Sequence, residues 1–261
     1  MQLAIRADVF YRAVKSTAFA ASRDFDARRP AFSGVLLDVS PMTFRAVATD
    51  GYRLAYFASS DGHDCQETAT VILLARELAE LKLPRASNVI IEIAANDTEA
   101  VIQHEKAGFS VPVIQARYPN YLGVFPPMQG SVTLHCEKAE FLRALMDARW
   151  DTTRQNRNVF FWTRPGCIAF AAQDRTILSP VKIAAQCDYS ASGVFNANFL
   201  RDAVQALPSG RMQIQLVMPD AERPIRDAMH LSSVNQLGNV IRQLVMPCRF
   251  PFVPVLPGFD A

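Results

Sequence analysis

The chain has 261 residues, of which 50% are apolar, 27 are basic and 25 are acidic, so its net charge is +2. This length is near the point at which a single core stops growing and a chain divides into domains. The near-neutral charge excludes a bulk nucleic-acid-binding signature, so any contact with nucleic acid must come from uneven placement of charge.

The five cysteines show neither CxxC nor zinc-ligand spacing. An odd count without such spacing argues against a disulfide framework and a metal site, and it favours a reducing setting. The N-terminal sequence has no signal peptide, and no apolar run approaches the roughly 18 residues of a membrane span. We therefore expect a cytoplasmic protein with no cofactor, no metal and no membrane association.

A short strand that runs into a helix opens the chain, and the same pattern returns in its second half. Residues 3–14 can be laid on residues 134–145, with Leu, Phe, Arg and Ala recurring in register. Each predicted helix has one apolar face. These faces comprise Val9, Phe10, Ala13, Val14 and Thr17 in the first half, and Phe141, Leu142, Leu145 and Met146 in the second.

The two halves continue in the same way, which indicates a domain duplication. We predict second helices at 75–83 and 197–207, the latter with Asn196 as N-cap. The paired prolines of 126–130 (PPMQG) mark a linker. The pattern predicts an α+β fold of two tandem domains, each with two helices packed on antiparallel sheets. Strands are predicted at 34–39, 43–48, 52–57, 88–94, 99–104 and 108–114, and then at 158–163, 166–172, 176–185, 211–218, 226–232 and 240–246.

Catalytic chemistry finds little support in the sequence. His63, Asp64 and Cys65 invite a nucleophile interpretation, but they lie in a polar cluster that reads as a hairpin tip, where adjacent side chains rarely point together. His104 and His135 fall in predicted strands without a partner nearby in the sequence. Because no phosphate-binding, metalloprotease or nucleophile-elbow motif occurs, we expect no enzyme.

Four segments, taken in order, carry a resemblance to a known family. They are 30–37 (PAFSGVLL), 48–55 (ATDGYRLA), 118–121 (YPNY) and 246–249 (MPCR). The Asp-Gly pair of the second segment alone reads as a hairpin turn. Together the segments resemble the bacterial sliding clamp, the beta subunit of DNA polymerase III. Residues 1–126 resemble its middle domain and 131–250 its C-terminal domain, and an apolar, proline-rich tail follows at 251–261.

The resemblance implies a sliding-clamp-like processivity factor that encircles duplex DNA without sequence preference. It also implies a pocket between the two domains that binds peptides of DNA polymerase and of the clamp loader. The alternative is a clamp-like module that forms no ring and competes for clamp-binding peptides. Since two domains per chain need three chains to make a six-domain ring, we expect a homotrimer.

Position by position, the resemblance also assigns a partner-peptide pocket. Its apolar members can hold Leu or Phe anchors, and Arg53 and Arg249 can hold peptide carbonyls or a carboxylate at the rim. Gly123 stands where the family often has Arg. The assigned residues are Phe32, Thr49, Gly51, Tyr52, Arg53, Leu54, Pro119, Val124, Leu244, Met246, Pro247, Cys248 and Arg249.

Basic residues on or beside the four predicted helices form a predicted DNA-facing surface. Such a surface contacts phosphates without reading bases. Because acidic residues are interspersed, an ordinary solvated helix face is an equally good interpretation for any single helix. The residues are Arg12, Lys15, Arg28, Arg29, Arg76, Lys82, Lys138, Arg143, Arg149 and Arg201.

The tail is a departure from the family, whose members usually end within a residue or two of the position of Arg249. Here 250–261 (FPFVPVLPGFDA) continues, and its prolines restrict it to an extended form. Three interpretations stay open, in which the tail covers the pocket, binds a neighbour or packs on the surface.

Overall fold

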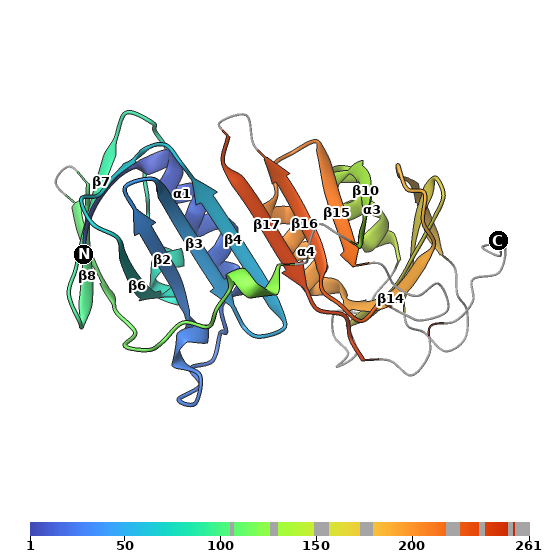
Figure 1. Ribbon diagram of the computed structural model, residues 1–261, viewed down its shortest axis with the longest axis horizontal. Helices are drawn as coiled ribbons and strands as arrows, with labels where there is room; N and C mark the ends of the chain where they lie inside the picture. Colours follow the sequence, from blue (N-terminus) through green and yellow to red (C-terminus); the bar gives the residue numbers. More distant parts are fainter. Residues whose placement is uncertain are drawn as a thin grey trace. The chain divides into compact units, whose positions relative to one another are not determined.

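The computed structural model describes residues 1–104, 107–125, 130–148, 157–172, 180–217, 225–234, 238–249 and 253 (Figure 1). The chain divides into two compact units. The first comprises residues 1–124 and 234–242, and the second comprises residues 125–233 and 243–261. The two prolines of the predicted linker lie outside the described residues.

The first unit contains two antiparallel sheets and two helices. One sheet has the strand order β5-β1-β7-β8-β9, and β4, β3, β2 and β6 are consecutive neighbours in the other. The elements are β1 (Gln2–Arg6), α1 (Ala7–Thr17), η1 (Ala18–Ala20), η2 (Pro30–Ser33), β2 (Gly34–Ser40), β3 (Thr43–Thr49), β4 (Arg53–Ser59), β5 (His63–Asp64), β6 (Ala69–Leu74), α2 (Ala75–Glu80), β7 (Ile90–Ala95), β8 (Glu99–His104), β9 (Ala107–Pro112) and η3 (Leu122–Val124).

Helix α1 lies between the two sheets of the first unit. It contacts β3 and β4 of one sheet and β1 and β7 of the other (Figure 1). The apolar face predicted from the sequence, from Val9 to Thr17, is buried, and Phe10 and Ala13 are fully inaccessible to solvent. Burial against both sheets stabilises this 11-residue helix, which would be marginal in isolation.

The second unit repeats this arrangement. The strand order β13-β12-β11-β14 forms one sheet, and β10, β15 and β16 are consecutive neighbours in the other. Its elements are β10 (Ser131–Glu137), α3 (Lys138–Asp147), β11 (Asn158–Arg164), β12 (Cys167–Ala172), β13 (Val181–Ala184), β14 (Ala191–Asn196), α4 (Ala197–Ala206), β15 (Arg211–Val217) and β16 (Met229–Val234). Strand β17 (Val240–Val245) begins in residues of the first unit and ends in residues of the second.

Four phenylalanines form the centre of the second unit. The ring of Phe141 on α3 meets the ring of Phe170 edge to face, with 4.8 Å between the ring centres. The ring centre of Phe161 lies 5.6 Å from that of Phe170 and 5.8 Å from that of Phe195. The predicted apolar face of this helix was wrong at Met146, which is 64% exposed near the end of α3. The last turn of α3 therefore projects beyond the core that buries Phe141.

The predicted elements are confirmed over most of the described chain, and one predicted helix is shorter than expected. Asn196 is the N-cap of α4, since its side chain accepts hydrogen bonds from the backbone N–H groups of Asn198 and Phe199. Helix α2 ends at Glu80 rather than at 83, because Leu81 has turned extended and Pro84 follows shortly. Of the predicted strand 176–185, residues 176–179 lie outside the described residues.

Candidate functional site

The β3–β4 turn is the centre of the assigned pocket in the first unit, and its geometry follows from Asp50 and Gly51. The Asp50 carboxylate accepts hydrogen bonds from the backbone N–H groups of Tyr52 at 2.9 Å and Arg53 at 3.1 Å. Thr49 Oγ1 donates to the Arg53 carbonyl at 2.6 Å and accepts from the Gly51 N–H at 3.1 Å. The predicted hairpin turn is confirmed, and these bonds hold it rigid.

Glycine is required at position 51 for two reasons. Its φ of +91° lies in the left-handed region that other residues rarely adopt. A Cβ atom there would also lie 3.2 Å from the Phe32 ring. The turn therefore packs directly on η2, and the Arg29 guanidinium lies 5.1 Å from the centre of the same Phe32 ring.

Arg53 does not have the rim position that the sequence suggested. Its side chain is only 8% exposed and forms an ion pair with Asp50 at 2.9 Å. Its Nη2 also donates to the Phe19 carbonyl oxygen at 2.8 Å, and its guanidinium lies 5.5 Å from the centre of the Phe19 ring. With these contacts Arg53 is a positioning residue for the turn, and the exposed member of the turn is Tyr52, at 65%.

A groove of about 820 Å³ runs beside this turn within the first unit. It is lined by residues 28–32 and 115–120, so the structure brings two assigned pocket residues, Phe32 and Pro119, to the same depression. Leu54 is buried on β4, and Val124 in η3 is 53% exposed. The groove also carries Arg28, Arg29 and Arg117, so its rim is basic.

Two tyrosines that flank Pro119 fasten this segment to the sheet. Tyr118 donates a hydrogen bond from its hydroxyl to the Val47 carbonyl oxygen at 3.2 Å, and Tyr121 donates to Asp38 Oδ2 at 2.5 Å. Burial raises the pKa of both phenols, and the bond to Asp38 raises that of Tyr121 further, so both remain donors at neutral pH. Their anchoring role did not follow from the YPNY match alone.

The assigned residues of the second unit lie at and after the end of β17. Leu244 is 3% exposed, Met246 is 43% exposed, Pro247 is partly buried and Arg249 is exposed. The Cys248 N–H donates to the Val194 carbonyl oxygen at 2.7 Å, and Cys248 Sγ donates to Asn158 Oδ1 at 3.2 Å. Because Leu54 and Met246 belong to different units, a groove that they share stays a prediction.

The basic residues of the helices fall into two groups. In the first group the charge is engaged within the protein. Arg12 pairs with Asp8 at 2.6 Å, and Arg201 pairs with Asp202 at 3.0 Å. Lys138 donates to the carbonyl oxygens of Gln205, at 3.0 Å, and Leu207 at the end of α4, and burial lowers its pKa. The Lys138 ammonium group therefore links α3 to α4, and a phosphate would have to compete with these carbonyl oxygens for it.

The second group is exposed. It comprises Lys15 in the last turn of α1, Arg143 in the middle of α3, Arg76 at the start of α2, and Lys82, which follows α2. Arg28 and Arg29 are exposed too, but they precede η2, beside the turn rather than on a helix. Arg149 lies outside the described residues.

Known proteins resemble this chain in both sequence and fold. Residues 4–120 match the family model described as the DNA polymerase III beta subunit, central domain. The chain is 24% identical over 220 residues to the beta sliding clamp of Chlamydia muridarum and 25% identical over 221 residues to that of Synechocystis. The chain is similar to bacterial sliding clamps in both sequence and fold. The resemblance seen in the sequence is thereby confirmed.

The extent of these matches is also informative. They cover 83% and 78% of this chain but only 57% and 56% of the two curated clamps, so the chain spans little more than half of their length. The crystal structure of the Pseudomonas aeruginosa DNA polymerase sliding clamp aligns with a TM-score of 0.81 and 18% identity, over 96% of this chain and 67% of that one. The two tandem clamp domains predicted from the sequence are confirmed by this likeness of fold.

His63 and Cys65 do not form a nucleophile pair. His63 and Asp64 are not a hairpin tip, as predicted, but form the short strand β5, which pairs with Ala4 and Ile5 of β1. His63 Nε2 hydrogen-bonds to the Ser40 carbonyl oxygen at 3.0 Å. Burial raises the pKa of the Cys65 thiol, which keeps it protonated and a poor nucleophile at neutral pH.

The described residues contain neither a cluster of potential metal ligands nor a helix that could span a membrane. Within that part of the chain, no three His, Cys, Asp or Glu side chains gather as ligands for a metal ion. None of the helices that the structure describes combines the length and the apolar character that crossing a membrane requires.

Replacing Arg53 tests its positioning role. Arg53→Met keeps the length and the apolar contact with Phe19 but leaves the half-buried Asp50 carboxylate without its partner, so unfolding free energy should fall by about 3 kcal/mol. Urea denaturation measures this decrease. Arg76→Met, a change at an exposed arginine on α2, is the matched control and should stay within about 0.5 kcal/mol. An equal loss of unfolding free energy in both variants would contradict the positioning role of Arg53.

Asp8 gives the first unit a defined pH dependence. Burial acts to raise the pKa of this carboxyl, but hydrogen bonding from Arg6 and the charges of Arg6 and Arg12 outweigh burial and hold it below the usual value. A lowered pKa contributes stability that is present above about pH 3.9, the unfolded value, and is lost as pH falls through the folded one.

Asp8→Asn should therefore be less stable than the wild type at pH 7. The difference should shrink as pH falls below about 4, because the unfolded wild-type chain takes up a proton on Asp8 there before the folded protein does. Urea unfolding at pH 7, 5 and 3 measures the difference. A gap that stays constant over this range would show that charge on Asp8 does not contribute.

Proposed function

We propose that the protein is a non-catalytic processivity factor of the sliding-clamp type, which encircles duplex DNA and holds DNA polymerase on it. The observation that carries the proposal is the match of residues 4–120 to the beta-subunit central domain, together with the second clamp domain that follows in the same chain. A cytoplasmic location accords with this function. Enzymatic roles are not proposed, since the best nucleophile candidate, Cys65, is buried and protonated.

The charge distribution favours enclosure of DNA over tight electrostatic attachment. The exposed cations Lys15 and Arg143 share the helices with acidic residues such as Glu140 and Asp147, and the net charge of the chain is only +2. A few phosphate contacts give weak, salt-sensitive and sequence-independent binding. Such binding lets a closed ring slide along DNA while the topology prevents its release.

Ring closure requires more than one chain, because each chain supplies two domains. A head-to-tail contact closes into a ring when its rotation allows, and three copies would supply six domains. Strand β9 at the end of one sheet in the first unit and β13 at the end of a sheet in the second are the edges that we propose to meet. We therefore propose a homotrimer.

Peptide capture is the second part of the proposed function. We propose that peptides of DNA polymerase and of the clamp loader insert Leu or Phe side chains between the β3–β4 turn and the segment that follows β17. Exposed Met246 suits this task, because methionine adapts to varied apolar ligands. Exposed Tyr52 adds aromatic contact area of the kind that dominates binding hot spots.

Charge reversal tests the interaction with DNA. Lys15→Glu combined with Arg143→Glu should weaken binding to duplex DNA of any sequence. It should also flatten the dependence of log K on log salt by about 0.9 for each phosphate that the protein no longer neutralises. Adding Arg12→Glu should weaken binding further by less than either exposed cation does, because Asp8 already neutralises Arg12.

The matched control for this experiment reverses two exposed arginines outside the helices, Arg23 and Arg226. Fluorescence anisotropy with labelled duplex at several salt concentrations measures both sets. If the helix variant and the control variant bind alike, the helices do not face DNA.

Met246→Asp tests peptide capture. A carboxylate among apolar partners costs several kcal/mol, so binding of a Leu/Phe-containing clamp-binding peptide should fall by about 100-fold or more in a calorimetric titration. Folding should survive, because Met246 is at the surface. Met42→Asp, a change at another exposed methionine, is the control. Unchanged affinity of the Met246 variant would contradict the proposed pocket.

A further inference from the structure

Strand β11 is buried on both of its faces, which is unusual for a sheet that has helices on one face only. Phe161 points to the helices, where it meets the rings of Phe170 and Phe195. Side chains alternate along a strand, so Phe160 and Trp162 point to the opposite face. Each of these two is nevertheless only 5% exposed. Something must cover this second face.

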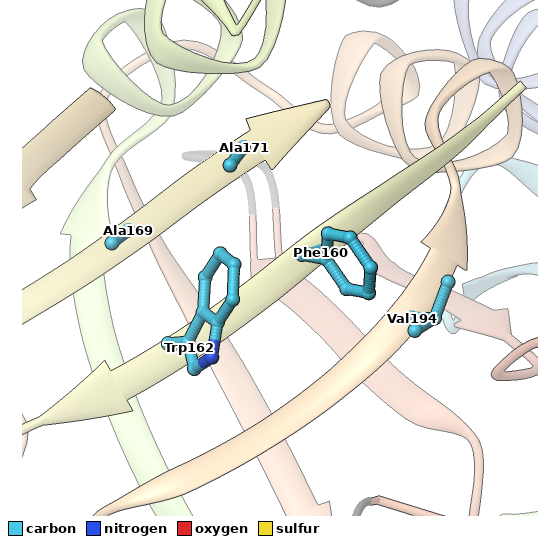
Figure 2. Packing of buried hydrophobic residues seen from close by; sticks show 5 residues of the cluster. All are labelled: Phe160, Trp162, Ala169, Ala171 and Val194. Carbon is cyan, nitrogen blue, oxygen red and sulfur yellow. The ribbon is translucent and has the colours of Figure 1, made fainter. Parts of the chain in front are cut away.

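The covered face carries a compact apolar cluster, which we name the outer cluster. It consists of Phe160, Trp162, Ala169, Ala171 and Val194. Figure 2 shows the two aromatic side chains on β11, flanked by the alanines of β12 on one side and by Val194 of β14 on the other. Phe160 stands opposite Ala171, and Trp162 stands opposite Ala169. The small alanine side chains of β12 therefore lie beside the large aromatic side chains of β11.

Two residues from the end of the chain pack against the outer cluster. They are Cys248 and Val253, both partly buried. The chain approaches along the edge of the sheet, where the Cys248 N–H donates to the Val194 carbonyl oxygen at 2.7 Å and Cys248 Sγ donates to Asn158 Oδ1 at 3.2 Å. Val253, five positions later, packs against the same cluster.

The composition of the segment fits this surface. The sequence 250–256 (FPFVPVL) supplies apolar side chains at five of its seven positions, and its two prolines favour an extended backbone. Apart from Val253, these residues lie outside the described residues. An uncovered Phe–Trp ridge would be an exposed apolar patch of the kind that causes association.

We propose that the C-terminal segment is an intramolecular strap that Cys248 and Val253 hold on the outer cluster, and that it does not occupy the partner-peptide pocket. The strap continues directly from Met246 and Pro247 through the fixed Cys248, so its attachment also sets the direction of the chain after β17. The location of the strap does not depend on the proposed function. Only its expected effect on the binding of a clamp-binding peptide does.

Trp162 reports on the strap directly. The chain has two tryptophans, so Trp150→Phe leaves Trp162 as the only indole. In that background, truncation after Arg249 should shift the emission of Trp162 to longer wavelength and make it more readily quenched by acrylamide, because water reaches the ridge. Adding a synthetic peptide of residues 250–261 should reverse both changes. Unchanged emission and quenching on truncation would overturn the strap.

Val253→Asp keeps the proposal testable if the truncated chain fails to fold. It should give the same red shift, since a carboxylate cannot stay against the indole without a partner. Val101→Asp, a change at an exposed valine on β8 of the first unit, is the matched control and should leave Trp162 emission unchanged. A red shift from both variants, or from neither, would contradict the assignment.

Peptide titration of the truncated protein separates the strap from self-occlusion of the pocket. A strap on the outer cluster predicts equal or lower affinity for a clamp-binding peptide after truncation. A several-fold rise in affinity would show that the tail competes for the pocket, and it would overturn the proposal. The emission measurements need neither DNA nor peptide, so they stand even if the proposed clamp function fails.

Discussion

Each unit buries helix faces between strands of two sheets, and this burial decides which side chains remain for function. In the first unit α1 contacts strands of both sheets, and in the second α3 contacts β10 on one side and β12 and β13 on the other. The residues that face the sheets are apolar and closely packed. Cations such as Lys15 and Arg143 are left on the opposite faces, where a nucleic acid could meet them.

The need to bury side chains also explains why the residues assigned to the pocket are not all exposed. A turn that presents Tyr52 must itself be rigid, and the rigidity comes from the buried pair of Arg53 with Asp50 and from the bond of Arg53 to the Phe19 carbonyl oxygen. Tyr118 and Tyr121 hold the segment around Pro119 in the same way. The residues assigned to the pocket therefore include both exposed residues, such as Tyr52, and buried positioning residues, such as Arg53.

The sequence predicted the fold well because its signals were local. Apolar periodicity placed α1 and α3, a side-chain oxygen at Asn196 placed the start of α4, and the Asp-Gly pair placed the β3–β4 turn. What it could not predict depends on distant contacts. The burial of Arg53, the engagement of Lys138 by the end of α4, and the pairing of His63 with β1 all join residues that lie far apart in the chain. The covered face of β11 was not predicted either, since a run of apolar residues does not say what lies on its second side.

We propose that this two-domain chain, which resembles the sliding clamp, works as a closed ring around duplex DNA. The most direct measurement is the molecular mass in solution by light scattering at micromolar concentration, with and without duplex DNA. A ring of six domains predicts the mass of three chains, each of 28.9 kDa. The mass of a single chain under both conditions would contradict the ring and leave a clamp-like module that binds peptides without encircling DNA.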